Sequence, residues 1–215
     1  HKIEGTNFTG SLLIGHSTTG TLSAAIKNTG VGLLALDALT SGDSNTAVGY
    51  NAGSNINSGS FNVLIGTQAG DALTGGTRNI AIGNNALTNE DVHGRNVAIG
   101  HNALFALNAG TDAYNVAVGY DAGVAVTTGT LNTIIGGLAG DALTTGARNV
   151  ALGYQALSDE DTGSRNTAIG YFALANQNSN TENYNVALGY NAAKDVTSGV
   201  QNTVIGSLAG DALTE

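Results

Sequence analysis

The stretch NTAIGYFAL, Asn166–Leu174, contains the pattern that decides the fold of this chain. Asn stands first, Gly fifth and Ala eighth, and the phrase returns as NTAVGYNAG from Asn45, NIAIGNNAL from Asn79 and NVALGYQAL from Asn149. Self-similarity at a short, fixed period is typical of repeat proteins, whose units pack mainly on their sequence neighbours. We therefore expect a stack of similar units in place of one thick globular core.

The spacing of the motif glycine defines the units. Twelve copies follow one another at intervals of 17 residues, except for two intervals of 19, and the first copy is degenerate, with Ser11 and Thr18 in place of Asn and Ala. A longer unit of 70 residues contains four copies, because NVLIGTQAGDALTGGTRN from Asn62 returns as NTIIGGLAGDALTTGARN from Asn132. We expect residues 1–10 to lead in from a preceding segment and residues 11–215 to form one repeat domain with this 70-residue super-repeat.

The composition of the chain agrees with thin layers and excludes several classes of partner. Gly contributes 32 residues, Pro, Cys, Met and Trp none, and aromatic residues only 5%. The net charge is −9, with seven Lys and Arg, so no basic cluster is present to replace the counterions of a nucleic acid. Apolar runs are only a few residues long, so no segment is expected to insert into a membrane.

Each copy contains the elements of one short coil. The segment N-[VT]-A-[IVL]-G is rich in β-branched residues and ends at Gly, which predicts a strand of about four residues followed by a tight bend. A second short strand is predicted at x-A-[LG], before a polar turn. Two strands in 17 residues indicate an all-β, parallel β-solenoid (β-roll) of about twelve coils. The longer copies are expected to bulge at residues 108–112 and 178–182 without a change of register.

The motif asparagines have a structural interpretation. Stacked at one corner of successive coils, their amides can donate and accept hydrogen bonds along the rod. Asp at this position would repel its neighbours, and Ser would reach less far. We therefore predict an asparagine ladder made of Asn28, Asn45, Asn62, Asn79, Asn96, Asn115, Asn132, Asn149, Asn166, Asn185 and Asn202.

The alternation of side-chain size along the strand predicts an assembly. Successive side chains of a strand face opposite ways, and the third motif position is usually Ala, which suits a narrow interior. The fourth position is always larger: Ile14, Val31, Val48, Ile65, Ile82, Ile99, Val118, Ile135, Leu152, Ile169, Leu188 and Ile205. An outer stripe of these residues would be too apolar for a soluble monomer, so we predict that it is the interface of a homotrimer. The alternative is a wider, monomeric solenoid with Ile and Val inside.

The repeats also resemble known families. NVAIG followed by xxA is similar to the head repeats of trimeric autotransporter adhesins of the YadA type, and RNTAIGYFAL, Arg165–Leu174, resembles repeats of bacteriophage tail fibres. The resemblance covers Ser11–Thr214, although the coils of the adhesin heads are shorter. It implies an extracellular fibre on a virion or cell surface, a shaft or head segment that presents binding faces to a host glycan or protein receptor.

Catalysis has little support in the sequence. No nucleophile motif accompanies the four histidines, so we expect no catalytic residue and no cofactor. Paired carboxylates occur around Glu90 and Glu160, but an acid–base role would need one of them to be desolvated. We expect both to lie in exposed turns, in solvated pairs with Arg95 and Arg165.

Calcium is the one metal that the acidic turns suggest. NEDVHG and SDEDTG supply carboxylate oxygens, with Asp91 and Asp161 as weak candidate ligands. Neither the spacing of an EF-hand nor the GGxGxD repeat of calcium-binding rolls is present. A turn without metal is the simpler expectation.

The remaining candidates concern the outside of the rod. Tyr50, Tyr120 and Tyr190 follow the motif glycine at 70-residue intervals, where they can contact a glycan or seal the rim of a subunit interface. Two other classes of function stay open. Rods can stack end to end into an extracellular filament, because open solenoid ends invite pairing. An ice-binding face is the weaker rival, because Thr at the second motif position alternates irregularly with Val.

Overall fold

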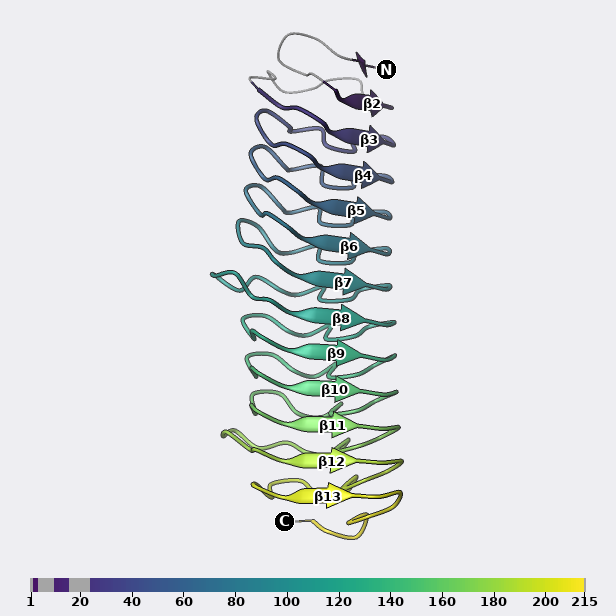
Figure 1. Ribbon diagram of the computed structural model, residues 1–215, viewed down its shortest axis with the longest axis vertical. Coiled ribbons are helices and arrows are strands. Elements are labelled where there is room, and N and C mark those ends of the chain that lie inside the picture. The colour runs from purple at the N-terminus through teal and green to yellow at the C-terminus, as the bar shows by residue number, and fades with distance from the viewer. Residues whose placement is uncertain (1, 4–9, 16–23, 215) are drawn as a thin grey trace.

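The chain forms a long rod of stacked coils (Figure 1). The computed structural model describes residues 2–3, 10–15 and 24–214; Thr18 and most of the expected lead-in at 1–10 lie outside them. The strands are β1 (Lys2–Ile3), β2 (Leu12–Ile14), β3 (Thr29–Val31), β4 (Thr46–Val48), β5 (Val63–Ile65), β6 (Ile80–Ile82), β7 (Val97–Ile99), β8 (Val116–Val118), β9 (Thr133–Ile135), β10 (Val150–Leu152), β11 (Thr167–Ile169), β12 (Val186–Leu188) and β13 (Thr203–Ile205). The predicted all-β, parallel solenoid is confirmed.

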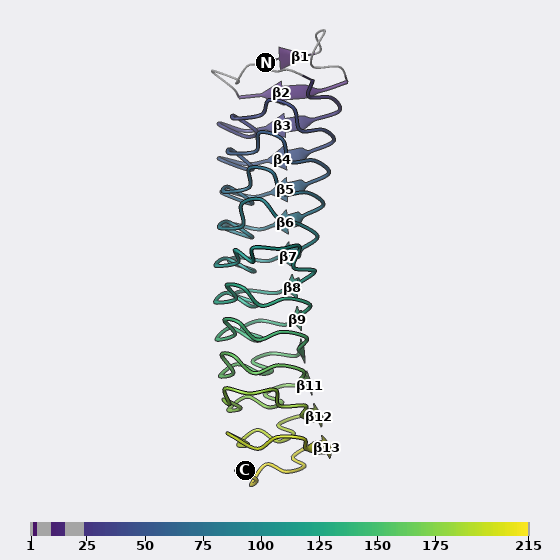
Figure 2. The same cartoon turned by 90° about the vertical axis from the view of Figure 1, so that its left-hand side faces the viewer.

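The strands pair in chain order, one per coil. β1 lies antiparallel to β2, and β2 to β13 form one parallel ladder along the rod (Figures 1 and 2). Val150 pairs with Thr167 across a 17-residue copy, and Val97 pairs with Val116 across a 19-residue copy. The loops between β7 and β8 and between β11 and β12 project beyond the others on the left of Figure 1. The two insertions therefore bulge outward and leave the register intact, as predicted.

The second strand predicted in each coil is wrong. Residues 84–87 form turns, and Asn85 and Leu87 have φ values of 56° and 52°, whereas a strand needs a negative φ. Their backbone N–H groups still pair with the neighbouring coils: Asn85 donates to the carbonyl of Thr67 at 2.9 Å, and Leu87 donates to that of Ala103 at 3.0 Å. The coil thus satisfies its backbone without a second ladder. The one strand per coil is three residues long, not four.

The motif glycine makes the corner after the strand. Gly136 has a φ of 138°, a conformation that residues with a Cβ rarely adopt. A Cβ built on it would overlap the carbonyl oxygen of Gly153, the corresponding residue of the next coil. Close stacking of the coils at this corner therefore requires Gly in every copy.

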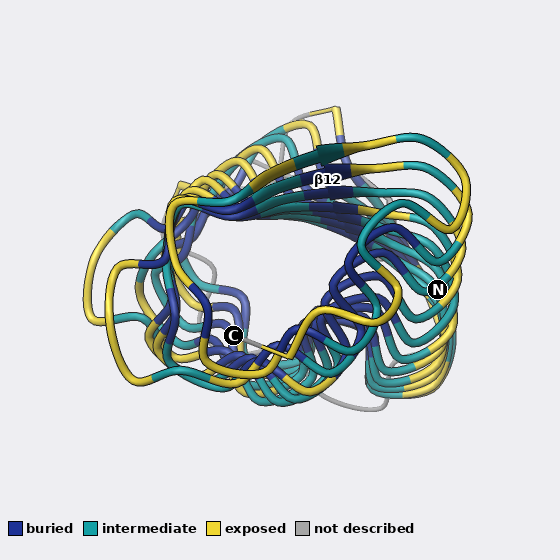
Figure 3. Ribbon diagram, turned by 90° about the horizontal axis from the view of Figure 1, so that it is seen from below, coloured by how far each residue is buried: buried dark blue, intermediate teal, exposed yellow. Residues whose placement is uncertain are grey.

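From β2 to β12 the strands bury their middle residue, as the alternation predicted. In β10, Ala151 is fully buried, whereas Val150 before it is half-buried and Leu152 after it is 42% exposed. Seen along the rod, buried segments line the inside of the coil and exposed ones its outline (Figure 3). The small third residue faces inward and the larger fourth residue faces outward, so the inverse arrangement with Ile and Val inside is wrong.

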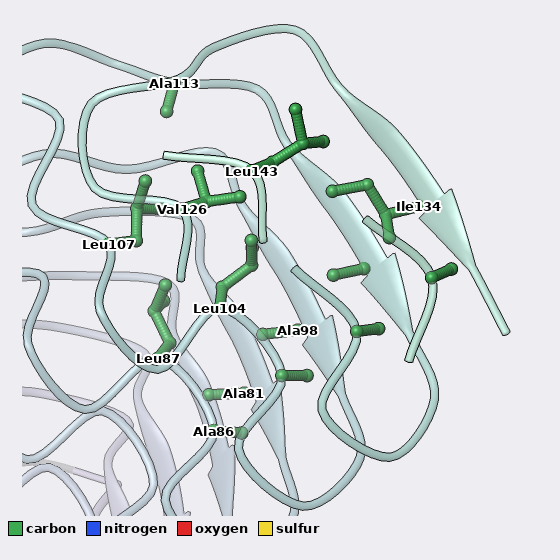
Figure 4. Packing of buried hydrophobic residues seen from close by; sticks show 14 of the residues in the cluster. Ala81, Ala86, Leu87, Ala98, Leu104, Leu107, Ala113, Val126, Ile134 and Leu143 are labelled. Atoms are coloured by element: carbon green, nitrogen blue, oxygen red, sulfur yellow. The ribbon is translucent and has the colours of Figure 1, made fainter. Parts of the chain in front are cut away.

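Two positions of the coil fill its interior together: the third motif position on the strand and the residue six positions after it. Where the strand presents Ala98, Leu104 fills the interior across from it, and both are fully buried (Figure 4). Where the strand presents Ile134, the position six residues later is Gly140, and a Cβ there would lie 3.5 Å from the Ile134 side chain. A large residue at either position thus meets a small one at the other. The coil with Ala117 has a small residue at both, and Ile134 of the next coil fills the space, 2.9 Å from a Cβ built on Gly123. This alternation over four coils gives the 70-residue super-repeat a packing reason.

Candidate functional site

The motif asparagines lie inside the rod and join neighbouring coils. Asn132 is fully buried; its backbone N–H donates to Oδ1 of Asn115 at 2.9 Å, and its own Oδ1 accepts the N–H of Asn149 at 2.9 Å. Its Nδ2 donates to the carbonyl of Gly146 at 2.9 Å, which closes the turn of its own coil. The expected amide-to-amide bonds occur in only some coils, as from Nδ2 of Asn62 to Oδ1 of Asn45 at 3.0 Å. The asparagines therefore bond chiefly to the backbone.

The first coil has a shorter version of this arrangement. Ser11 stands where the other copies have Asn, and its Oγ accepts the backbone N–H of Asn28 at 2.8 Å. The hydroxyl reproduces the acceptor of the amide toward the next coil. By these contacts the asparagines act as structural residues that join neighbouring coils.

The large apolar side chains that remain exposed gather along a few lines of the rod. The outer stripe, the residues at the fourth motif position, includes Ile65 at 38%, Leu188 at 45% and Ile205 at 65% exposure. Two flanking lines add to it. Phe61, Tyr114, Leu131 and Tyr184 stand directly before the motif asparagines, and Leu33, Tyr50, Tyr120, Tyr154, Tyr171 and Tyr190 stand directly after the motif glycines. The outer stripe itself is apolar on coil after coil, whereas the two flanking lines also hold polar and charged residues such as Arg78, Arg148 and Asn84.

The acidic turns differ from the expectation. Glu90 and Glu160 are fully buried, so the prediction of solvated carboxylates at these two residues is wrong. Each occupies the seventh position after the motif glycine, which in other coils is a buried aliphatic residue such as Leu73 or Leu143. This register was visible in the sequence, and it was the signal that could have placed both carboxyls in the core.

The buried carboxyls hold the turns around them. Glu160 accepts hydrogen bonds from the backbone N–H of Gly163 at 2.7 Å, from Nδ2 of Asn183 at 2.6 Å and from the N–H of Ser179 at 3.4 Å. Glu90 likewise accepts from His93 and from Ala109. Desolvation by burial raises the pKa of both carboxyls, although these donors partly oppose it. Because Ala109 and Ser179 belong to the enlarged turns of the next coil, the carboxyls anchor those turns.

The arginines expected beside these carboxyls pair elsewhere. Arg95 forms an ion pair with Asp112, and Arg165 with Glu182, so both contact the inserted residues of the 19-residue coils. Each guanidinium also lies over an aromatic ring: Arg165 is 5.2 Å from the centroid of Tyr184. The ion pairs are partly solvent-exposed and are expected to contribute little to stability.

The weak calcium candidates act as turn residues. Oδ1 of Asp91 accepts the N–H of Val92 at 2.6 Å, and Oδ1 of Asp161 accepts that of Thr162 at 2.7 Å. Glu90, Asp91 and His93 bring one ligand atom each to within 4.8 Å of one another. The corresponding position of His93 in the next super-repeat is Gly163, so this grouping is not repeated. The contact between His93 and the buried Glu90 explains why these three side chains lie close together without a metal.

The tyrosines after the motif glycines form stacks along the rod. Tyr154 stacks on Tyr171 with ring centroids 5.5 Å apart, and Tyr171 stacks on Tyr190 at 5.4 Å. Tyr120 stacks on His101 at 5.3 Å, whereas Tyr50 stands between Leu33 and Thr67 in the same line. We call this line, from Leu33 to Ser207, the tyrosine column. It is exposed, and it contains Tyr50, Tyr120 and Tyr190, the candidate glycan contacts predicted from the sequence.

Comparisons with known proteins identify no relative. No protein-family model, no curated protein and no solved structure matches the chain. Among the residues that the structure describes, no helix is long and apolar enough to cross a bilayer.

Proposed function

We propose that this chain is a structural segment of an extracellular fibre, a shaft or head segment of a virion tail fibre or cell-surface adhesin, and that it assembles as a homotrimer. The observation that carries the proposal is the outer stripe, which exposes an Ile, Val or Leu on coil after coil. A continuous apolar surface of this kind is typical of an interface. Three rods around a common axis would cover all three stripes, because closed symmetry leaves no stripe unpaired.

The proposed role is mechanical. Backbone ladders between coils, buried asparagines and a packed interior give a rod whose stability increases with the number of neighbouring coils. A trimer of such rods would be a stiff spacer that resists proteolysis, with any glycan or protein receptor bound at the turns or the tyrosine column. The resemblance of RNTAIGYFAL to tail-fibre repeats and of NVAIG to adhesin heads supports this proposal.

The mass of the chain in solution tests the proposal directly. We expect light scattering after size-exclusion chromatography to give three times 21.4 kDa, independent of concentration. A stable monomer would contradict the trimer. A mass that grows with concentration would instead favour end-to-end stacking into filaments, the second candidate from the sequence.

A further inference from the structure

Between His101 and Tyr190 the tyrosine column lacks one ring. Reading along the rod, it contains His101, Tyr120, Gly137, Tyr154 and then two further tyrosines. Backbone hydrogen bonds keep these positions in register, since Leu138 donates to the carbonyl of Tyr120 at 2.9 Å and Gln155 to that of Gly137 at 3.1 Å. One coil of the column therefore offers no side chain between two aromatic neighbours.

The space above Gly137 is bounded by aromatic faces. A Cβ built on Gly137 would have only ring atoms of Tyr154 within 4 Å, at 3.6 and 3.9 Å. Tyr120 stacks on His101 and is 58% exposed, and Tyr154 stacks on Tyr171 and is 44% exposed. Because Gly137 has no ring to stack on either of them, one face of Tyr120 and one face of Tyr154 are turned toward the missing position.

We propose that this position binds one pyranose ring of a saccharide, sandwiched between Tyr120 and Tyr154. Two coil steps of ~4.8 Å separate the two ring planes by roughly 10 Å. A flat ring in contact with both tyrosines needs only about 7 Å, twice the carbon–carbon contact distance. A puckered pyranose with axial C–H bonds on both faces is thicker and fills more of the interval.

The chemistry of the two faces selects the kind of sugar. An aromatic face carries partial negative charge and attracts the slightly positive hydrogens of C–H bonds. A β-glucopyranose unit, whose substituents are all equatorial, presents axial C–H bonds on both faces, whereas an axial hydroxyl, as in mannose, would meet a ring. Gln155, the residue after Tyr154, is half-buried, and its backbone N–H donates to the carbonyl of Gly137 at 3.1 Å, which places it next to the position. Its side-chain amide can bond an equatorial hydroxyl at the edge of the sugar.

This saccharide site rests on the proposed function in one respect: a ligand binds at the outer surface of the fibre. All its residues belong to one protomer, so it does not require the trimer. The mass measurement and the binding measurement can thus fail separately. A trimer without saccharide binding overturns this inference alone, and a monomer that binds the saccharide overturns the trimer alone.

The test uses cellotetraose, an oligomer of β-glucose, in calorimetric titration of the whole chain. We expect binding that weakens at least tenfold in Tyr120→Ala and in Gly137→Tyr. The second variant supplies the missing ring, and it is compatible with the fold because Gly137 does not share the positive φ of Gly136 and its Cβ contact is ordinary. Circular dichroism and the urea midpoint verify that each variant is folded.

A matched control comes from outside the tyrosine column. Tyr114→Ala removes a tyrosine that is 50% exposed and stands before a motif asparagine, and it should leave the affinity within twofold of the wild type. Mannotetraose and indole are the comparison ligands. The inference is overturned if the wild type does not bind cellotetraose at millimolar concentration, if Gly137→Tyr binds as the wild type does, or if mannotetraose or indole binds as tightly.

Discussion

Asparagine at the start of the strand both accepts and donates a hydrogen bond through one short side chain. In Asn132 the amide oxygen accepts a backbone N–H of the next coil, while the amide nitrogen donates to a carbonyl of its own coil. Asp lacks the donor and would bury a charge, and Ser supplies the acceptor over a shorter reach. In the first coil, Ser11 supplies only the acceptor: its hydroxyl oxygen accepts the backbone N–H of Asn28. The asparagine ladder could be predicted from the repeat. The backbone groups that bond to it could not, because their positions depend on the fold of the turn.

The cost of losing one asparagine follows from the groups left behind. Asn132→Ala leaves the N–H of Asn149 and the carbonyl of Gly146 unpaired in the interior, which is expected to lower the free energy of unfolding by about 1–3 kcal/mol for each group. Asn132→Ser should cost less, because the hydroxyl can accept as Ser11 does. Urea unfolding followed by circular dichroism measures both. Asn84→Ala, at an exposed site, is the control, and equal losses at the two asparagines would refute a structural role for the ladder.

The two buried glutamates make the free energy of unfolding depend on pH. Burial raises the pKa of Glu90 and Glu160 above the ordinary value of 4.5, so the folded chain holds these protons more tightly than the unfolded chain. The free energy of unfolding should therefore fall as pH rises from about 4.5 through the folded-state pKa, and should level off above it. The glutamine variant of both residues, E90Q/E160Q, removes these two titrating groups.

We expect urea unfolding between about pH 4 and 8 to show a shallower fall in E90Q/E160Q than in the wild type. Some fall should remain, because desolvation also raises the pKa of Asp141. If the profiles of the two proteins coincide, the buried carboxyls titrate alike in the folded and unfolded chains, and our account of their burial is wrong.

At the scale of the coil, the strand was predictable and the remainder was not. Strand alternation follows from backbone geometry, so Ala151 inside and Leu152 outside could be read from the motif. The segment after the glycine was taken for a second strand, but residues such as Leu87 adopt a positive φ that no local propensity predicts. Packing of Leu87 in the interior compensates for that conformation, and packing depends on neighbouring coils.

The exchange of size inside the coil can be tested by a double-mutant cycle. Ile134→Ala is expected to cost about 2–5 kcal/mol by leaving a cavity. Gly140→Leu alone should also destabilise, because Ile134 and Leu143 occupy the space that the new side chain needs. Together the two changes recreate the Ala and Leu pairing of Ala151 and Leu157, where Leu157 has a φ of 56°.

The combined variant should therefore lose less stability than the sum of the two single losses, with a favourable coupling of about 0.5–3 kcal/mol. Urea unfolding of the wild type and the three variants provides the cycle. Simple additivity of the two losses would contradict the packing explanation of the 70-residue super-repeat.

At the scale of the whole molecule, each strand carries an inward side chain that packs within the rod and, next to it, an outward side chain on the proposed interface. Ala151 is sealed within the rod and Leu152 faces outward, so substitutions at adjacent residues should act at different levels. Ala151→Glu places a charge in the interior and is expected to unfold its part of the solenoid. Leu152→Glu combined with Leu188→Glu places charges on the proposed interface without touching the interior.

If the outer stripe joins three copies, the double variant should be a monomer by light scattering and retain the circular dichroism of the wild type. Like charges facing one another across a threefold axis would oppose association, while the single rod keeps its ladders and its packed interior. A double variant that remains trimeric would place the interface elsewhere on the rod. A double variant that unfolds would show instead that the stripe supports the single coil, because its loss would then act within one chain.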